Sequence, residues 1–341
     1  MSKKENASCP RADIGGQAVL DGVMMKSPDA VAVAVRRANG DIVVKREDYV
    51  SPAKKHKWMG LPFIRGSVNM VQMLGLGMRV LDDSMKMSGD ESMQEEPSKF
   101  EKWLAEKLGK NVDKVVMGVA VVMAVALSVG LFVLLPNLVI MLFPKNATGG
   151  TLLLKNLVSG VIRIALLIAY ISAVGQVPDM RKTFQYHGSE HKTVYCHEHD
   201  LPLTPKNAQQ FTTLHPRCGT SFLILTFILS VLFYSIIDVL VLQLTGFDLG
   251  AHYLLRVLSR IVLLPCVAGV SYEALKALAH HEGPLVRALR WPGLQMQRLT
   301  TRQPSDDQCE VAIASMNAAL YGLPEGEVTP EGWVILHPAQ A

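Results

Sequence analysis

The chain has 341 residues, of which 49% are hydrophobic and 19% charged, and its mean hydropathy of +0.23 excludes a disordered or fibrous protein. The net charge of +4 is too small for a dedicated nucleic-acid binder, and five cysteines, an odd number, exclude a disulfide scaffold. We therefore predict an α-helical integral membrane protein with a sizeable water-facing part.

Residues 1–60 are expected to form a small cytoplasmic region that contains a β-hairpin. The runs 30–37 and 41–47 indicate strands on either side of Ala38-Asn39-Gly40. Asn-Gly between two strand-like runs favours a hairpin, because both turn positions need a positive φ. The glycine-containing stretch 14–25 is more easily explained as a turn and strand packed under this hairpin than as a backbone clamp beside an active site.

Residues 61–81 predict an amphipathic helix that lies in the membrane interface. Arg65, Asn69 and Gln72 follow the spacing i, i+4, i+7 and make one polar stripe on an otherwise apolar helix. A re-entrant segment is the alternative. Residues 82–113 are expected to be a polar linker followed by a basic helix.

Four apolar stretches predict transmembrane helices, at residues 115–143, 153–177, 219–244 and 252–279. They form two pairs within 114–177 and 219–279, and the first stretch is long enough to need tilt or a bend near Pro136. Charged residues lie inside these stretches, namely Arg163, Asp238, Arg256 and Arg260. We favour snorkelling, or a pair between Asp238 and an arginine, over a substrate or ion path.

Basic residues near the helix ends predict the orientation. The short loop 144–152 holds one lysine, and the short loop 245–251 holds neither Lys nor Arg. By contrast, residues 178–218 and both flanks of the apolar region are rich in Lys and Arg. Both termini, the 178–218 loop and a C-terminal cap at 280–341 are therefore expected on the cytoplasmic side of the inner membrane. In that reducing compartment, cysteine near histidine indicates metal binding or catalysis.

The loop 178–218 holds the residues that could carry chemistry. Five of the ten histidines lie within 29 residues there, and the loop also holds two cysteines and two glutamates near them: His187, His191, His197, His199, His215, Cys196, Cys218, Glu190 and Glu198. On a helix, His187 and His191 would share one face at i, i+4, and Glu190 would stand beside them. This His-x-x-Glu-His order is that of inverted zinc metallopeptidases, in which the glutamate is the general base.

A catalytic zinc needs three protein ligands, and His215 or Cys218, spaced i, i+3, would supply the third. Cys196, His197 and His199 could form a second site or support the first. Nearby basic residues could hold an anionic group of a substrate: Arg181, Lys182, Lys192 and Arg217. The rival interpretation is a closed structural site that pins the loop.

Four stretches resemble one known family: IGGQAVLDGVMMKSP, HGSEHKTVYCHEHD, LHPRCGTSFL and PGLQMQRLTTRQPSDDQCEVAI. They are similar to the motifs of the YqhQ-like family of bacterial multi-span membrane proteins, and the resemblance covers residues 13 to 315. Members are often labelled predicted metal-dependent enzymes, which implies a metal at the histidine-rich loop but names no substrate.

The leading hypothesis is a membrane-embedded, zinc-dependent hydrolase that acts at the cytoplasmic face on a lipid or a membrane peptide. His187, His191 and one of His215 or Cys218 would bind the metal, and Glu190 would activate water. The alternative is a non-enzymatic assembly or regulatory factor, in which a metal-pinned loop docks a partner protein. A di-iron oxidase, with iron ligands added at residues 280–282, is a minor alternative, and the chain could form an oligomer.

Overall fold

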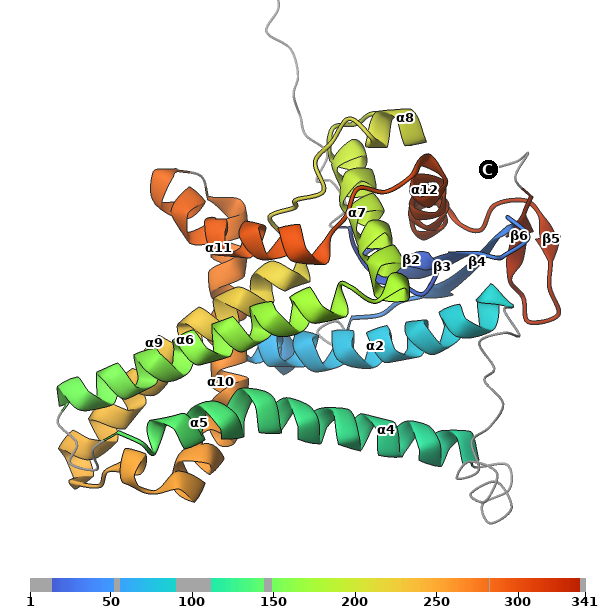
Figure 1. Cartoon of the computed structure of the whole chain (residues 1–341). Helices are drawn as coiled ribbons and strands as arrows, with labels where there is room; N and C mark the ends of the chain where they lie inside the picture. The colour runs from blue at the N-terminus through green and yellow to red at the C-terminus, as the bar shows by residue number, and fades with distance from the viewer. Residues whose placement is uncertain (1–13, 52–55, 90–111, 144–148, 282, 338–341) are drawn as a thin grey trace, which may run out of the picture.

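The computed structural model describes residues 14–51, 56–89, 112–143, 149–281 and 283–337 (Figure 1). Within these residues the chain forms a six-stranded sheet packed between helices, and four helices that are long and apolar enough to cross a membrane. The mostly helical architecture and the N-terminal strands agree with the sequence prediction.

The sheet is antiparallel throughout, with the strand order β1-β2-β3-β4-β6-β5. Its strands are β1 (Gly15–Val19), β2 (Gly22–Lys26), β3 (Ala30–Arg36), β4 (Ile42–Asp48), β5 (Glu327–Val328) and β6 (Val334–Leu336). The predicted hairpin is β3 and β4. Gly40 in its turn has a φ of +94°, whereas Asn39 lacks the positive φ that was expected of both turn positions. The stretch before it forms a second hairpin, β1 and β2, rather than a single strand.

Both faces of the sheet are covered by helices. Ala32 and Ala34 pack with α12 (Asp306–Tyr321) on one face, and Val33 packs with α2 (Ile64–Ser88) on the other. Figure 1 shows the sheet between these two layers, with α7 (Pro178–Glu198) on the same side as α12. Because both faces are buried, β3 is apolar at nearly every position.

The C-terminal residues complete this unit. β6 pairs with β4 along Ile42–Val44, and the backbone N–H of Met25 donates to the Ser315 hydroxyl over 3.1 Å. Residues 1–60 and 280–341 were predicted to be separate regions, but the structure joins them in one sheet. Pairing between strands nearly 300 residues apart leaves no local signal in the sequence.

Helix α2 is amphipathic, as predicted, and continues beyond residue 81 to Ser88. Its polar stripe faces the protein, since Arg65 bonds Glu273 of α10 (Tyr253–His280) through both carboxylate oxygens, at 2.7 and 2.5 Å. Its exposed side carries large apolar residues: Val71, Leu74, Met78, Leu81 and Met85. Most of the predicted linker, residues 90–111, lies outside the described residues.

The four predicted spans are confirmed as apolar helices, over Gly118–Ile140, Gly150–Val174, Gly219–Thr245 and Tyr253–Leu278. The elements are α4 (Val112–Val129), a π-helical turn η4 (Gly130–Leu134), α5 (Leu135–Ile140), α6 (Gly149–Val174), α9 (Gly219–Thr245) and α10, with η5 (Leu249–Ala251) before α10. An irregularity was expected near Pro136, and a π turn is found there, which ends at Leu134, two residues before the proline.

The segment between the second and third spans is largely helical. It contains α7, α8 (Pro205–Ala208) and the turn that leads into α9. Helix α11 (Pro284–Thr300) packs on α9 so closely that a Cβ at Gly293 would lie 2.8 Å from the Ser221 hydroxyl. A short 3-10 helix, η1 (Lys57–Gly60), precedes α2. Helix α7 thus lies between the sheet and the apolar helices.

Candidate metal centre

Helix α7 presents the first two histidines on one face. His187 and His191 are one turn apart, and their ring centroids are separated by 4.5 Å. Pro178 in the first turn of the helix starts it without losing a backbone hydrogen bond. The predicted i, i+4 pair is therefore confirmed.

Gly188 lets a distant segment approach α7. A Cβ at this position would lie only 2.1 Å from the carbonyl oxygen of Arg302. The N–H of Arg302 in turn donates to the Phe184 carbonyl over 2.9 Å, so residues 300–302 run directly against the helix. The close approach explains why a helix-weakening glycine stands between the two histidines.

Two backbone carbonyls fix the histidine tautomers. The Nδ1 of His187 is 2.9 Å from the carbonyl oxygen of Thr300, and the Nδ1 of His191 is 2.5 Å from that of Thr213. Because a carbonyl only accepts, each Nδ1 must carry the proton. Each Nε2 then has a free lone pair, which is the arrangement of metal-binding histidines.

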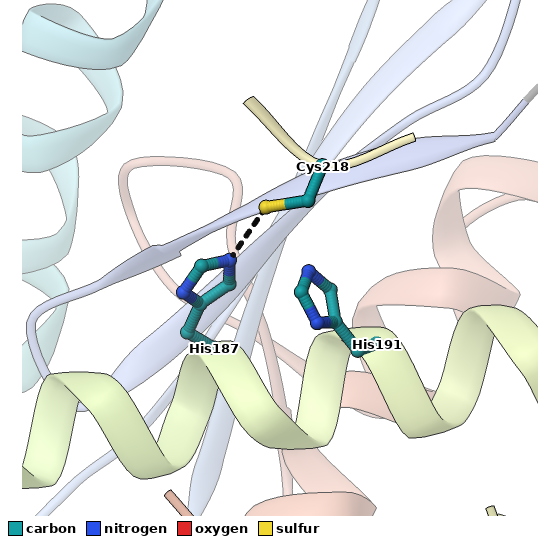
Figure 2. Close-up of side chains that lie close together, drawn as sticks. All are labelled: His187, His191 and Cys218. Carbon is teal, nitrogen blue, oxygen red and sulfur yellow. Dashed lines mark hydrogen bonds between the residues drawn. The ribbon is translucent and has the colours of Figure 1, made fainter. Parts of the chain in front are cut away.

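Cys218 brings a thiol to the same place. It is the N-cap residue of α9, and its Sγ lies 3.2 Å from the Nε2 of His187. Figure 2 shows the sulfur above the two imidazoles. One ligand atom from each of His187, His191 and Cys218 lies within 4.8 Å of the others. In a tetrahedral zinc site, N and S ligands are separated by roughly 3.5 Å, given the usual bond lengths.

Glu190 is buried next to this group, with 5% of its surface exposed. Its Oε2 is 3.4 Å from the Nε2 of His191, yet this nitrogen has no hydrogen-bond partner. With the proton on Nδ1, the lone pair of Nε2 points to a buried site that also holds a carboxylate group. A cation there would be bound by both groups, so the donor set fits a metal ion.

The first strand of the sheet holds Glu190 in place. A Cβ at Gly16 of β1 would lie 2.7 Å from the Cγ of Glu190 and 2.6 Å from the Met24 carbonyl oxygen. For the stretch 14–25, the sequence favoured a turn and strand packed under the hairpin over a backbone clamp beside an active site, without deciding between them. The structure places β1 against the acidic residue of the site.

His215 lies beside the group but in a different hydrogen-bonding state. Its Nδ1 accepts from the N–H of Arg217 at 3.4 Å, and its Nε2 is 3.4 Å from a carboxylate oxygen of Glu198. Burial lowers the pKa of His215, and the negative charge of Glu190 opposes this shift. Its ring centroid is 5.6 Å from that of His191. Of the two residues considered for the third ligand, Cys218 is thus the one grouped with both helical histidines.

Helix α11 positions the loop that carries His215. The side chain of Gln297 accepts from the backbone N–H of His215 and donates to its carbonyl, both at 2.7 Å. Gln297 is fully buried and also donates to the Ser221 hydroxyl over 2.8 Å. This role of Gln297 could not be predicted from the sequence, because a single glutamine in an amphipathic helix carries no distinguishing signal.

The remaining predicted ligands lie elsewhere in the described residues. The Cys196 thiol is buried with Cys309 and bonds the Pro202 carbonyl at 3.4 Å, and burial raises its pKa. His199 is exposed, and its Nδ1 donates to the Tyr195 carbonyl. His197 is not part of the three-residue group. His281 is exposed, and Glu282 falls outside the described residues.

The basic residues divide into two kinds. Lys192 is buried, and its ammonium group bonds the carbonyls of Gln209 and Phe211, so it supports the loop rather than facing a substrate. Burial lowers its pKa. Arg217 is partly exposed beside the site and pairs with Glu198, whereas Arg181 is exposed in the first turn of α7.

Residues 61–321 match the family described as "Protein of unknown function (DUF1385)". The chain is also similar to "Uncharacterized protein YqhQ" of Bacillus subtilis (strain 168), with 31% identity over 316 residues, or 90% of this chain and 92% of that protein. No solved structure matches the chain significantly. The resemblance found in the sequence motifs is thereby confirmed.

Proposed function

Because the chain belongs to the YqhQ-like family, whose description as DUF1385 assigns no activity, we propose a function from its own residues: a metal-dependent hydrolase at a membrane surface. The metal ligands are His187, His191 and Cys218, and Glu190 is the general base. The observation that carries this proposal is the buried pair His191 Nε2 and Glu190 Oε2, which lie 3.4 Å apart although the nitrogen makes no hydrogen bond within the described residues.

Zinc suits these ligands best, since two imidazoles and one thiolate are the donors of known catalytic zinc sites with an open fourth position. When bound, zinc lowers the pKa of a coordinated water to about 7 and polarises a substrate carbonyl or phosphoryl oxygen. Glu190 is placed to accept the proton of the attacking water, and β1 holds it there. His215 and Glu198, next to it, could pass that proton on.

The substrate class follows from the position of the site. Cys218 directly precedes the first residue of α9, so the site lies at the end of a helix that is long enough to span a membrane. The exposed apolar side of α2 would lie in the interface beside it. We infer that α7 and both termini are on the cytoplasmic side of the inner membrane, as the basic residues indicate, and that the substrate is a lipid or a membrane peptide.

A structural metal site in a non-enzymatic factor is the second candidate, favoured by the burial of the group. His191 is 1% exposed and Glu190 5%, and a metal there would tie α7 to the segment that ends in Cys218. In that case a partner protein, rather than a substrate, would engage the membrane-proximal surface. The minor alternative, a di-iron oxidase, would differ from both candidates in that the bound metal would be iron.

Elemental analysis of the full chain, purified in detergent, tests the site. We expect about one zinc per chain, loss of this zinc in His187→Ala, and retention in Glu190→Gln. Release of fatty acid or head group from an extract of membrane lipids, or of peptide from a membrane-protein digest, tests the hydrolase. Wild-type activity that Glu190→Gln abolishes while it keeps zinc supports catalysis. Zinc without activity in either assay supports the structural site, and no metal in the wild type refutes both.

A further inference from the structure

A second cluster of charged residues is buried among the apolar helices, far from the candidate metal centre. Arg163 of α6, Asp238 of α9, and Arg256 and Arg260 of α10 are each at most 7% exposed. Asn156 of α6 lies among them. Charges at such positions are costly, so each of them needs a partner.

Asp238 neutralises Arg260. The guanidinium of Arg260 bonds both carboxylate oxygens, at 2.9 and 2.5 Å. The amide nitrogen of Asn156 donates to Asp238 at 2.9 Å, which turns the amide oxygen of Asn156 toward Arg256. The predicted pair between Asp238 and an arginine is thus confirmed, and both carboxylate oxygens of Asp238 already accept hydrogen bonds.

Arg256 keeps unused hydrogen-bond donors. Its Nη2 bonds the Asn156 amide oxygen at 2.9 Å, but its Nε and Nη1 are buried and have no partner among the residues that the structure describes. Asp248, in the loop before α10, attracts Arg256 more weakly than Asp238 does, and Arg163 and Arg260 both repel it. Three guanidinium groups thus lie near two carboxylates, and Lys155, next to Asn156 on α6, is buried as well, so positive charge is in excess among the described residues here.

Asp238, Asn156 and Arg256 lie toward the opposite end of the spanning helices from Cys218, and Arg163, in the middle of α6, lies deeper. Asp238 is twenty residues further along α9 than Cys218, or roughly 30 Å at 1.5 Å per residue, which is about the thickness of a hydrocarbon core. Arg256 is in the first turn of α10. If the first residues of α9 lie at one membrane surface, Arg256 therefore lies near the phosphates of the other leaflet.

We propose that this end of the bundle binds a phosphate group, held by the free Nε and Nη1 of Arg256, with Arg163 adding positive charge. Guanidinium groups match phosphate oxygens in geometry, and a phosphodiester would supply negative charge where positive groups are in excess. The phosphate could belong to an anionic phospholipid or be free in solution. This proposal does not depend on the metal or on hydrolysis.

Lipid-dependent melting of the delipidated full chain in a non-ionic detergent tests it. Dioleoylphosphatidylglycerol is compared with dioleoylglycerol, which has the same acyl chains and no phosphate, and with inorganic phosphate alone. We expect the phosphate-bearing lipid, and not dioleoylglycerol, to raise the melting temperature by several degrees. Stabilisation by inorganic phosphate alone would identify the free ion as the source. An equal response to both lipids, with none to phosphate, would overturn the proposal.

Arg256→Gln should weaken phosphate-dependent stabilisation by roughly tenfold or more, as expected for loss of charge-assisted hydrogen bonds. Arg287→Gln, an exposed arginine on α11, is the matched control and should respond like the wild type. If Arg256→Gln does not fold, Arg256→Lys keeps the charge but loses the planar donors, and it should show an intermediate response. A wild-type response in a folded variant of Arg256 would refute the site.

Discussion

The Nε2 of His187 and the Sγ of Cys218 lie 3.2 Å apart, although His187 is in α7, Cys218 precedes α9, and the two residues are 31 positions apart in the chain. The proton on Nδ1 of His187 is held by Thr300, so Nε2 faces the sulfur with its lone pair. The two atoms thus lie about as far apart as two ligands of one ion would, and the proposed metal binding can be examined spectroscopically.

Cobalt bound in place of zinc should show a thiolate-to-metal charge-transfer band in the wild type. Cys218→Ser should abolish this band and weaken cobalt binding by roughly 10–100-fold or more, because it replaces the only sulfur in the three-residue group. Cys266→Ser changes an exposed cysteine of α10 and should leave the band unchanged. A band that survives Cys218→Ser would exclude Cys218 as a ligand.

Gly188→Ala should destabilise the protein by about 1–3 kcal/mol, despite the higher helix propensity of alanine. The new Cβ would lie 2.1 Å from the Arg302 carbonyl and push residues 300–302 away from α7. Gly75→Ala, on the exposed side of α2 with no atom within 4 Å of its Cβ, should instead stabilise by about 0.5–1 kcal/mol. Thermal melting in detergent measures both. Equal effects would show that residues 300–302 do not constrain α7.

Hydrophobic periodicity and residue spacing correctly predicted the structural elements that are determined by residues close together in the chain. The four apolar helices, the hairpin at Gly40 and the pairing of His187 with His191 on one face all follow from spacing along the chain. They could be predicted because helix periodicity and the hydrophobic pattern of a span or strand are set by residues only a few positions apart.

The parts that depend on distant contacts were not predictable. The carbonyls of Thr213 and Thr300 select the histidine tautomers, but every residue has a carbonyl. The pairing of β4 with β6 and the packing of Gly16 on Glu190 join segments whose proximity exists only in the folded chain. Gly16 and Gly188 are the visible signs of these contacts in the sequence, because each is a glycine where the local strand or helix does not require one.

Gly16→Ala should disturb the site through Glu190. The added Cβ would come within 2.7 Å of the Glu190 Cγ and 2.6 Å of a backbone oxygen in β2, so we expect a loss of about 1–3 kcal/mol and of any hydrolytic activity. Gly15→Ala provides an adjacent control, since its Cβ would meet no atom within 4 Å. The two variants are compared by thermal melting and zinc content. If both behave like the wild type, β1 does not position Glu190.

The stability of the metal-free protein should fall as the pH drops below the ordinary histidine pKa near 6.5. Burial lowers the pKa of His215, so between the lowered and the ordinary value the unfolded chain binds more protons than the folded one, and acid favours unfolding. His215→Asn should reduce this dependence. Melting temperatures of chelator-treated protein at pH 7.5 down to about 5 measure the slope. An unchanged slope in the variant would assign the effect to another group.

The exposed side of α2 should contact lipid along its length. Leu74 is 67% exposed and belongs to a row of large apolar side chains, whereas Tyr321, at the end of α12, is 78% exposed on the other side of the sheet. In a Cys266→Ser background, an environment-sensitive fluorophore on Leu74→Cys should be quenched by doxyl-labelled lipids in nanodiscs. The same label on Tyr321→Cys should not be quenched, because water surrounds it. Equal quenching at both positions would contradict an interfacial α2 and leave its apolar row for a protein partner.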